Sequence, residues 1–177
     1  MPRVNSRSKG RRGEVKAKEV LQKWTGMEFH RVPASGGLRW KKTDNITGDL
    51  ICGHPTHRFD FSIEVKNYRE INFEHLLMPQ VKSIITNEFW PQCLKDADRG
   101  KKIPLLMMRY DGIRPGDFFF LVMRYLDFKF FKKYLDTTLP YFKYGKLVIL
   151  NSNILFETDY DECIKPLSEK LIKKLWN

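Results

Sequence analysis

Residues 59–68 read FDFSIEVKNY, and from Phe59 to Lys66 apolar and polar side chains alternate. This alternation predicts a β-strand with one buried face and one exposed face. Glu64 and Lys66 lie two residues apart, so their side chains share the polar face and start about 7 Å apart. The pattern leaves two interpretations of this pair, which are a solvated surface and a chemical site.

The composition is that of one folded domain. The chain has 177 residues, of which 42% are hydrophobic and 30% are charged, and this balance excludes wholesale disorder. No apolar run reaches the ~18 residues that a membrane span needs, and no apolar signal-peptide core follows the basic N-terminus. The three cysteines are odd in number and widely spaced, which favours a reducing, cytoplasmic setting over a disulfide framework.

The net charge is +11, from 32 basic and 21 acidic residues. It is uneven, because residues 1–24 hold eight Lys or Arg against only Glu14 and Glu19. A basic surface attracts polyanions, and nucleic acid is the first candidate. No strongly apolar basic helix supports a membrane partner. Ribosomal and other structural nucleic-acid binders carry similar charge, so charge alone does not choose an enzyme.

Residues 12–24 are predicted to form a helix, because Ala17, Val20, Leu21 and Trp24 fall on one stripe. The patterns that follow predict a strand at 29–32, a long basic loop at 33–48, a strand at 49–52, and the strand 59–68 antiparallel to it. Farther along they predict helices at 79–89 and 91–99, strands at 103–110 and 118–123, a helix at 125–135, a hairpin around 151–153 and a helix at 166–176.

Three acids and one lysine form the candidate site. Asp49 starts the strand next to Glu64, so a hairpin can place the two carboxylates side by side. Glu14 lies about 70° from the centre of the helix's buried stripe, at the edge of the core face. Converging carboxylates bind Mg²⁺, which lowers the pKa of a bound water and stabilises a leaving oxygen. Lys66 would orient the attacking water or stabilise charge on a phosphate. This is the chemistry of a phosphodiesterase.

Plainer interpretations exist for each residue. Glu-x-Lys on a strand is commonly a solvated face, Gly48-Asp49 before an apolar run is often a turn, and Glu14 suits a helix N-terminus. The order of the features favours a nuclease: an acid on the first helix, a basic loop, a Gly-Asp strand, a hairpin and a Glu-x-Lys strand.

Four stretches carry a family resemblance: RRGEVKAKEVL (11–21), VPASGG (32–37), GDLI (48–51) and IEVKNY (63–68). Together they resemble the PD-(D/E)xK nuclease superfamily, and within it the archaeal and phage Holliday junction resolvases. The resemblance spans about residues 9–110. It implies a mixed α/β, restriction-endonuclease-like core with an N-terminal helix and a central mixed sheet of four to five strands flanked by helices. It also implies Mg²⁺, replaceable by Mn²⁺, and homodimers that nick four-way DNA junctions in pairs.

The resemblance assigns roles by motif. Glu14, Asp49 and Glu64 match the metal-binding acids, Lys66 completes the Glu-x-Lys pair, and Ser35 matches a loop serine near the scissile phosphate. The predicted DNA contacts are Arg11, Arg12, Arg39, Lys41, Lys42 and Gln80, the last matching a glutamine on the helix after Glu-x-Lys. The chain departs from the family in having Gly48-Asp49 rather than Pro-Asp, a long loop before it, and about 65 final residues that match no known pattern.

We therefore predict a flexible basic arm over residues 1–10, a nuclease core over 11–125, and a C-terminal extension over 126–177 packed on the same domain. The predicted activity is that of a Mg²⁺-dependent, structure-selective DNA endonuclease, with resolution of Holliday junctions in recombination and repair as the leading substrate class. The predicted partners are branched or duplex DNA and a second copy of the chain, with no membrane and no small-molecule cofactor. The alternatives are another nuclease of the superfamily, acting on flaps, ends or specific sites, and a non-catalytic DNA-binding module.

Two further patterns have alternative interpretations. Cys52, His54 and His57 could bind zinc, but a closed site needs a fourth ligand such as Cys93, and exposed histidines in a turn are the simpler interpretation. The stretch FKFFKKY (128–134) interleaves lysines with aromatics, which suits either nucleic-acid contact or an amphipathic helix with its aromatics in the core.

Overall fold

The computed structural model describes residues 6–32, 46–53, 58–78, 80–115 and 118–176. Its strands are β1 (Phe29–Arg31), β2 (Leu50–Cys52), β3 (Phe61–Tyr68), β4 (Ile103–Tyr110), β5 (Phe120–Arg124), β6 (Tyr141–Tyr144) and β7 (Leu147–Asn151). Its α-helices are α1 (Ser6–Thr25), α2 (Trp90–Gly100), α3 (Tyr125–Phe131), α4 (Ser152–Phe156) and α5 (Lys165–Trp176). Short 3₁₀ segments are η2 (Phe73–Leu76) and η4 (Lys132–Tyr134), and π segments are η3 (Ile85–Phe89) and η5 (Tyr160–Ile164).

The strands of the described residues form one seven-stranded sheet in the order β1-β2-β3-β4-β5-β7-β6. Strands β3 and β4 run parallel and their neighbours pair antiparallel. The predicted mixed α/β, restriction-endonuclease-like architecture is confirmed. The expected four to five strands were too few, because β6 and β7, from residues beyond the family resemblance, extend the same sheet through β5.

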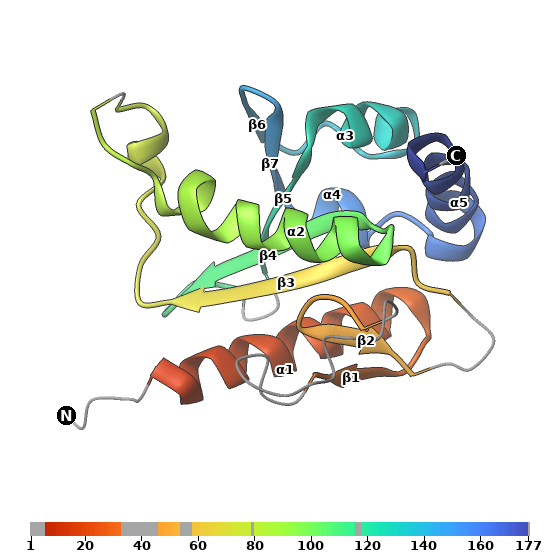
Figure 1. The fold of residues 1–177 in the computed structure, drawn as a ribbon, viewed down its shortest axis with the longest axis horizontal. Helices are drawn as coiled ribbons and strands as arrows, with labels where there is room; N and C mark the ends of the chain where they lie inside the picture. The colour runs from red at the N-terminus through yellow and green to blue at the C-terminus, as the bar shows by residue number, and fades with distance from the viewer. Residues whose placement is uncertain (1–5, 33–45, 54–57, 79, 116–117, 177) are drawn as a thin grey trace.

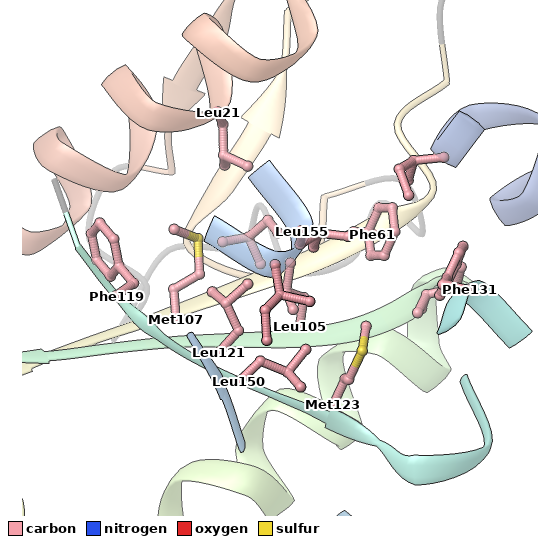
Figure 2. Packing of buried hydrophobic residues seen from close by; sticks show 14 of the residues in the cluster. Leu21, Phe61, Leu105, Met107, Phe119, Leu121, Met123, Phe131, Leu150 and Leu155 are labelled. Atoms are coloured by element: carbon pink, nitrogen blue, oxygen red, sulfur yellow. The ribbon is translucent and has the colours of Figure 1, made fainter. Parts of the chain in front are cut away.

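Helices cover both faces of the central strands. Figure 1 shows α1 and α2 on opposite sides of β3 and β4. On the α1 side, Phe61, Ile63 and Val65 join a core that contains Ala17 and Leu21. Figure 2 shows side chains of β4, β5 and β7 in the same cluster. The predicted apolar stripe of the first helix therefore packs on the sheet as expected.

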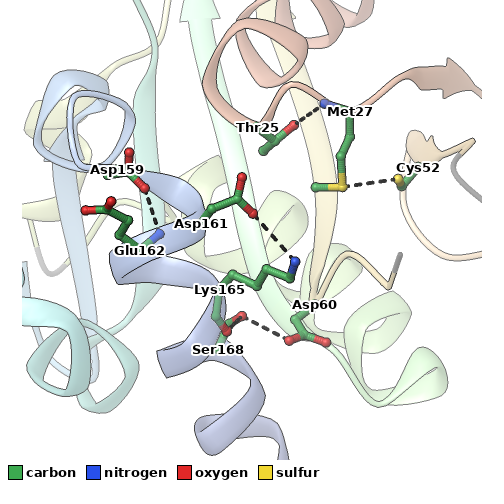
Figure 3. Close-up of polar contacts among 9 residues, drawn as sticks. All are labelled: Thr25, Met27, Cys52, Asp60, Asp159, Asp161, Glu162, Lys165 and Ser168. Carbon is green, nitrogen blue, oxygen red and sulfur yellow. Dashed lines mark hydrogen bonds and ion pairs between the residues drawn. The ribbon is translucent and has the colours of Figure 1, made fainter. Parts of the chain in front are cut away.

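The polar side of the 59–68 stretch is buried, which corrects the prediction of an exposed face. Ser62 and Glu64 are each only 1% exposed, because α2 packs over this side of β3. Asp60 is also buried, and its carboxylate accepts a hydrogen bond from Ser168 Oγ at 2.9 Å (Figure 3) and contacts Arg58 Nε at 3.1 Å. Polar atoms buried in this way need partners, so Glu64 is not an incidental surface acid.

Four predicted elements have different bounds in the structure. The helices expected at 79–89 and 91–99 are one continuous helical run that starts at Ile84, passes through η3 and continues as α2. The helix α1 begins at Ser6, so residues 6–10 of the expected arm are helical. The chain reverses between β6 and β7 at Gly145, whose φ is +55°, and not at 151–153. At residues 151–153, the Asn151 side chain instead accepts a hydrogen bond from Asn153 N and caps α4.

The other predicted elements agree in type with the structure. Strands β4 and β5 lie where strands were predicted, and α3 with η4 and then α5 occupy the two predicted C-terminal helices. Across the described ranges, no helix has both the length and the apolar character required to cross a membrane.

Candidate active site

Backbone contacts between β2 and β3 fix the position of Asp49. Its N–H donates to Ile63 O at 2.7 Å, and its Oδ2 accepts from Val65 N at 2.8 Å. The carboxylate is thus attached to the β3 backbone at the residue between Glu64 and Lys66. This confirms the hairpin that the sequence predicted between the two acidic strands, with Leu50 paired to Ile63.

Gly48 makes this approach possible. Its φ is +76°, and a Cβ at this position would lie 2.2 Å from Ile63 O. Proline fixes φ near −65° and cannot adopt this conformation. Because this chain has Gly48 where the family has proline, its local backbone conformation differs. Glycine alone lets the strands approach closely enough for the Asp49 hydrogen bonds.

Asp49 and Glu64 form a crowded acidic pair in the interior. Asp49 is 9% exposed and Glu64 is 1% exposed. Burial, followed by the charge of Glu64, raises the pKa of Asp49 to about 7, although the hydrogen bond from Val65 acts in the opposite direction. Two carboxylates that disfavour each other's charge in a low-dielectric site suit a hard divalent cation such as Mg²⁺. The donor set present therefore fits such a metal.

Lys66 lies against this pair and is held from two sides. Its Nζ is 2.7 Å from Glu64 Oε1 and donates to Gln92 Oε1 at 2.9 Å, with the Phe89 ring centroid 5.5 Å away. Burial lowers the pKa of Lys66, but the charges of Glu64 and Asp49 outweigh that effect and leave its pKa raised. Lys66 is therefore a protonated donor near neutral pH.

Gln92 is a site residue that the sequence reasoning missed. The glutamine expected on the helix after Glu-x-Lys was Gln80, but Gln80 is exposed in a turn before the helical run that starts at Ile84. Gln92 lies in the first turn of α2 and reaches Lys66. The sequence did place Gln92 inside the predicted helix 91–99. However, the preceding helix was predicted to start too early, at residue 79, so Gln80 was matched to the family glutamine instead.

Glu14 lies near the site but is engaged by another residue. Arg31 of β1 places both Nε and Nη2 2.5 Å from Glu14 Oε2. The charge of Glu14 still contributes to raising the pKa of Asp49. Within the described part of the chain, no group of three or more His, Cys, Asp or Glu side chains is placed to hold a metal ion. The structure thus brings Asp49, Glu64 and Lys66 together, with Glu14 paired to Arg31 beside them.

Several other predicted residues can be placed. Arg11 and Arg12 are exposed on α1, where DNA can reach them. Cys52 Sγ lies 3.7 Å from Met27 Sδ (Figure 3), and Cys93 of α2 is buried in the cluster between this helix and the sheet. The predicted residues Ser35, Arg39, Lys41, Lys42, His54 and His57 lie outside the described residues.

Comparison with known proteins identifies the family of this chain. The family model described as "Phage putative PDDEXK endonuclease" matches residues 5–155. The chain belongs to this family of phage PD-(D/E)xK endonucleases. Asp49, Glu64 and Lys66 all lie within the matched span, in the order that the name of the motif gives. The match also extends past the earlier family resemblance and includes β5, β6 and β7 of this chain.

One curated relative is similar to this chain. Protein D14 of Escherichia phage T5 is 30% identical over 109 residues, which cover 61% of this chain and 66% of that protein. The match therefore spans just under two thirds of the relative's length. No solved structure matches the chain at a significant level.

Proposed function

We propose that this chain is a divalent-metal-dependent DNA endonuclease that hydrolyses phosphodiester bonds at Asp49, Glu64 and Lys66. The observation that carries the proposal is the buried carboxylate pair, in which burial and Glu64 raise the pKa of Asp49 to about 7. Family membership supports the reaction class. A basic protein that concentrates two acids beside one lysine has the charge pattern of a metal site facing a polyanion.

Each residue has a distinct role in this proposal. Asp49 and Glu64 would hold Mg²⁺, with Mn²⁺ as a substitute, and Glu14 would assist directly or through a water. The bound cation would supply Lewis acidity, which lowers the pKa of a coordinated water and stabilises the leaving oxygen. Lys66, fixed by Glu64 and Gln92, donates hydrogen bonds that orient the attacking water and stabilise charge on the phosphate.

Basic residues would hold the DNA without reading its sequence. Arg11 and Arg12 are exposed on α1, which packs on β3 beside the acidic pair. Phosphate contacts from such residues fix the position of the duplex. Arg39, Lys41 and Lys42 are proposed to extend this surface, with Ser35 near the scissile phosphate and Gln80 as a further DNA contact.

The finer proposal is that the substrate is branched DNA, with the four-way junction as the leading case. The motifs at Glu14, Asp49 and Glu64-x-Lys66, together with the loop sequence ASGG, support it by their resemblance to junction resolvases. A two-fold homodimer would present two active sites to opposite strands, which suits paired nicks.

A cleavage assay with three substrates tests the proposal. The protein is incubated with Mg²⁺ or Mn²⁺ and end-labelled four-way junction, flap or plain duplex of matched sequence. Symmetric nicks at the junction are expected, with little cutting of duplex. Equal cutting of all three would remove the junction proposal and leave a general nuclease. Binding without cutting, unchanged in Glu64→Gln, would leave a non-catalytic DNA-binding module. Glu162→Gln, the same change at an exposed position in η5, is the matched control.

A further inference from the structure

The face of β3 that bears Glu64 and Lys66 continues to one more side chain, that of Tyr68. Alternate residues of a strand point to the same side, so Glu64, Lys66 and Tyr68 form one row with steps of about 7 Å. Tyr68 is the last residue of β3 and also ends the stretch FDFSIEVKNY. It is the one side chain of this row that has no role in the reaction proposed above.

Exposure increases along the row from the acid to its end. The side chains of Glu64 and Lys66 are 2% and 16% exposed, whereas Tyr68 is 41% exposed. The helix α2 packs over the part of β3 that carries the acid. The row therefore opens to solvent at Tyr68, and a DNA strand that enters from this end to reach Lys66 passes over the tyrosine.

Packing on Phe89 fixes the orientation of the Tyr68 ring. The two ring centroids are 4.9 Å apart with an angle of 47° between the ring planes, and Phe89 is itself buried. The centroid of the same Phe89 ring lies 5.5 Å from Lys66 Nζ. One buried ring thus supports both side chains, on the side of the sheet that faces α2. A side chain held in place before binding loses little conformational entropy when it makes a contact.

The hydroxyl group of Tyr68 is available to an outside partner. Among the described residues, none forms a hydrogen bond with it. A phenol hydroxyl donates to phosphate oxygens, and tyrosine makes such contacts in protein–DNA interfaces. Successive phosphates of one DNA strand rise by about 3.4 Å along the duplex axis. A side chain about 7 Å from Lys66 therefore faces a phosphate one or two nucleotides from the phosphate at Lys66.

We propose that the Tyr68 hydroxyl donates a hydrogen bond to a DNA phosphate one or two nucleotides from the bond that is cut beside Lys66. The choice of DNA as the ligand rests on the proposed function. Arg11 and Arg12 lie on α1, on the opposite side of β3, so Tyr68 would contact the substrate strand from the α2 side. A phosphate contact fixes the position of the strand without reading its bases. If the ring only covered Phe89, the hydroxyl would not be needed.

Binding in the absence of metal tests the hydroxyl alone. The full-length protein is titrated, in chelator, into labelled four-way junctions of two unrelated sequences, and affinity is measured by anisotropy over a range of salt concentrations. Tyr68→Phe removes only the hydroxyl and keeps the ring on Phe89, so the melting temperature should not change. Tyr134→Phe is the matched control, because Tyr134 is 43% exposed and lies in η4, beside α3.

Tyr68→Phe should weaken binding by about 10-fold or more for both junction sequences, as loss of a hydrogen bond to a charged group requires. The slope of log affinity against log salt concentration should stay the same, because a neutral hydroxyl releases no counterions. In cleavage with Mg²⁺, the KM of Tyr68→Phe should rise by the same factor as its Kd. Tyr134→Phe should bind as wild type does.

Five results would overturn the inference: wild-type affinity in Tyr68→Phe, a loss confined to one sequence, a shallower salt slope, a lower melting temperature, or an equal loss in Tyr134→Phe. A different result would remove the proposed function, namely wild type that binds the junctions but cuts nothing with Mg²⁺. In that case the loss of binding in Tyr68→Phe would still establish the phosphate contact.

Discussion

Asp49 takes part in two sets of contacts with different consequences. Its main chain and its Oδ2 are both bonded to the backbone of β3, which fixes its position. Its charge is opposed by burial and by Glu64, which raise its pKa to about 7. The fold therefore holds an acid where its ionised form is unfavourable, and an acid of this kind is usually functional.

The raised pKa of Asp49 predicts how the stability of the metal-free protein depends on pH. An acid whose pKa is higher in the folded state stabilises that state below the unfolded pKa and loses this contribution as pH rises through the folded pKa. In chelator, the free energy of unfolding should fall between pH 4 and pH 7 by on the order of 2–4 kcal/mol. Urea denaturation measures it. Asp49→Asn should show a smaller fall, and Mg²⁺ should restore the stability of wild type at pH 8. Identical pH profiles for wild type and variant would contradict this account.

Gln92 and Gln80 provide a test of which glutamine serves the site. Gln92 accepts a hydrogen bond from Lys66, so Gln92→Ala should lower the single-turnover cleavage rate by about 10-fold, with an unchanged melting temperature because Gln92 is exposed. Lys66→Ala, which removes the donor itself, should cost about 10²–10³-fold. Gln80→Ala should have little effect on the rate. A larger loss in Gln80→Ala than in Gln92→Ala would mean that the sequence match was correct and the hydrogen bond incidental.

At the scale of elements, the approach of β2 to β3 depends on Gly48. Gly48→Ala places a Cβ 2.2 Å from Ile63 O in a backbone with φ of +76°, so we expect a loss of about 2 kcal/mol or more in the free energy of unfolding. Gly112→Ala is the control, because Gly112 also has a positive φ, of +84°, but its Cβ would meet no atom within 4 Å. Urea denaturation should show the smaller loss for Gly112→Ala. Equal losses would show that backbone conformation alone, and not the close strand contact, requires glycine.

The C-terminal helix α5 is joined to the strand that carries the site. Ser168 Oγ donates to the buried Asp60 carboxylate at 2.9 Å, which links α5 to the residue before β3 (Figure 3). Ser168→Ala should lower the free energy of unfolding by about 1–3 kcal/mol, the usual value for a buried hydrogen bond to a charged group. Thr138→Ala removes a similar hydroxyl-to-carboxylate bond, to Asp136, at an exposed position and should change little. A comparable effect of both substitutions would argue that burial of Asp60 is unimportant.

For the whole molecule, the sequence predicted the central part of the fold and the proximity of Asp49, Glu64 and Lys66 in the candidate site. The period-2 pattern located β3, the apolar stripe located α1, and the acids on neighbouring strands led to Asp49 beside Glu64. These inferences succeeded because each depends on residues close in the chain or on one hairpin. Long-range contacts were missed. The burial of Glu64 under α2, the pairing of Glu14 with Arg31 and the contact of Lys66 with Gln92 all depend on how distant elements pack.

The C-terminal third also contains long-range contacts that local sequence pattern does not predict. Its strands β6 and β7 could not be assigned to the central sheet from local pattern, because a short strand reveals its partner only through register. Once paired, they extend the sheet beyond β5. The strands of the described residues thus form one continuous sheet, and Glu64 and Lys66 lie on its strand β3.

Asp49 and Glu64 together are proposed to form a metal-dependent nuclease site. Its most direct test is the single-turnover rate of cleavage of a labelled four-way junction, measured as Mg²⁺ is titrated into chelated protein. We expect no cleavage without metal, saturable cleavage by wild type, and a loss of at least about 100-fold in both Asp49→Asn and Glu64→Gln at saturating Mg²⁺. Cleavage that persists in chelator, or that survives either substitution at the wild-type rate, would contradict this proposal.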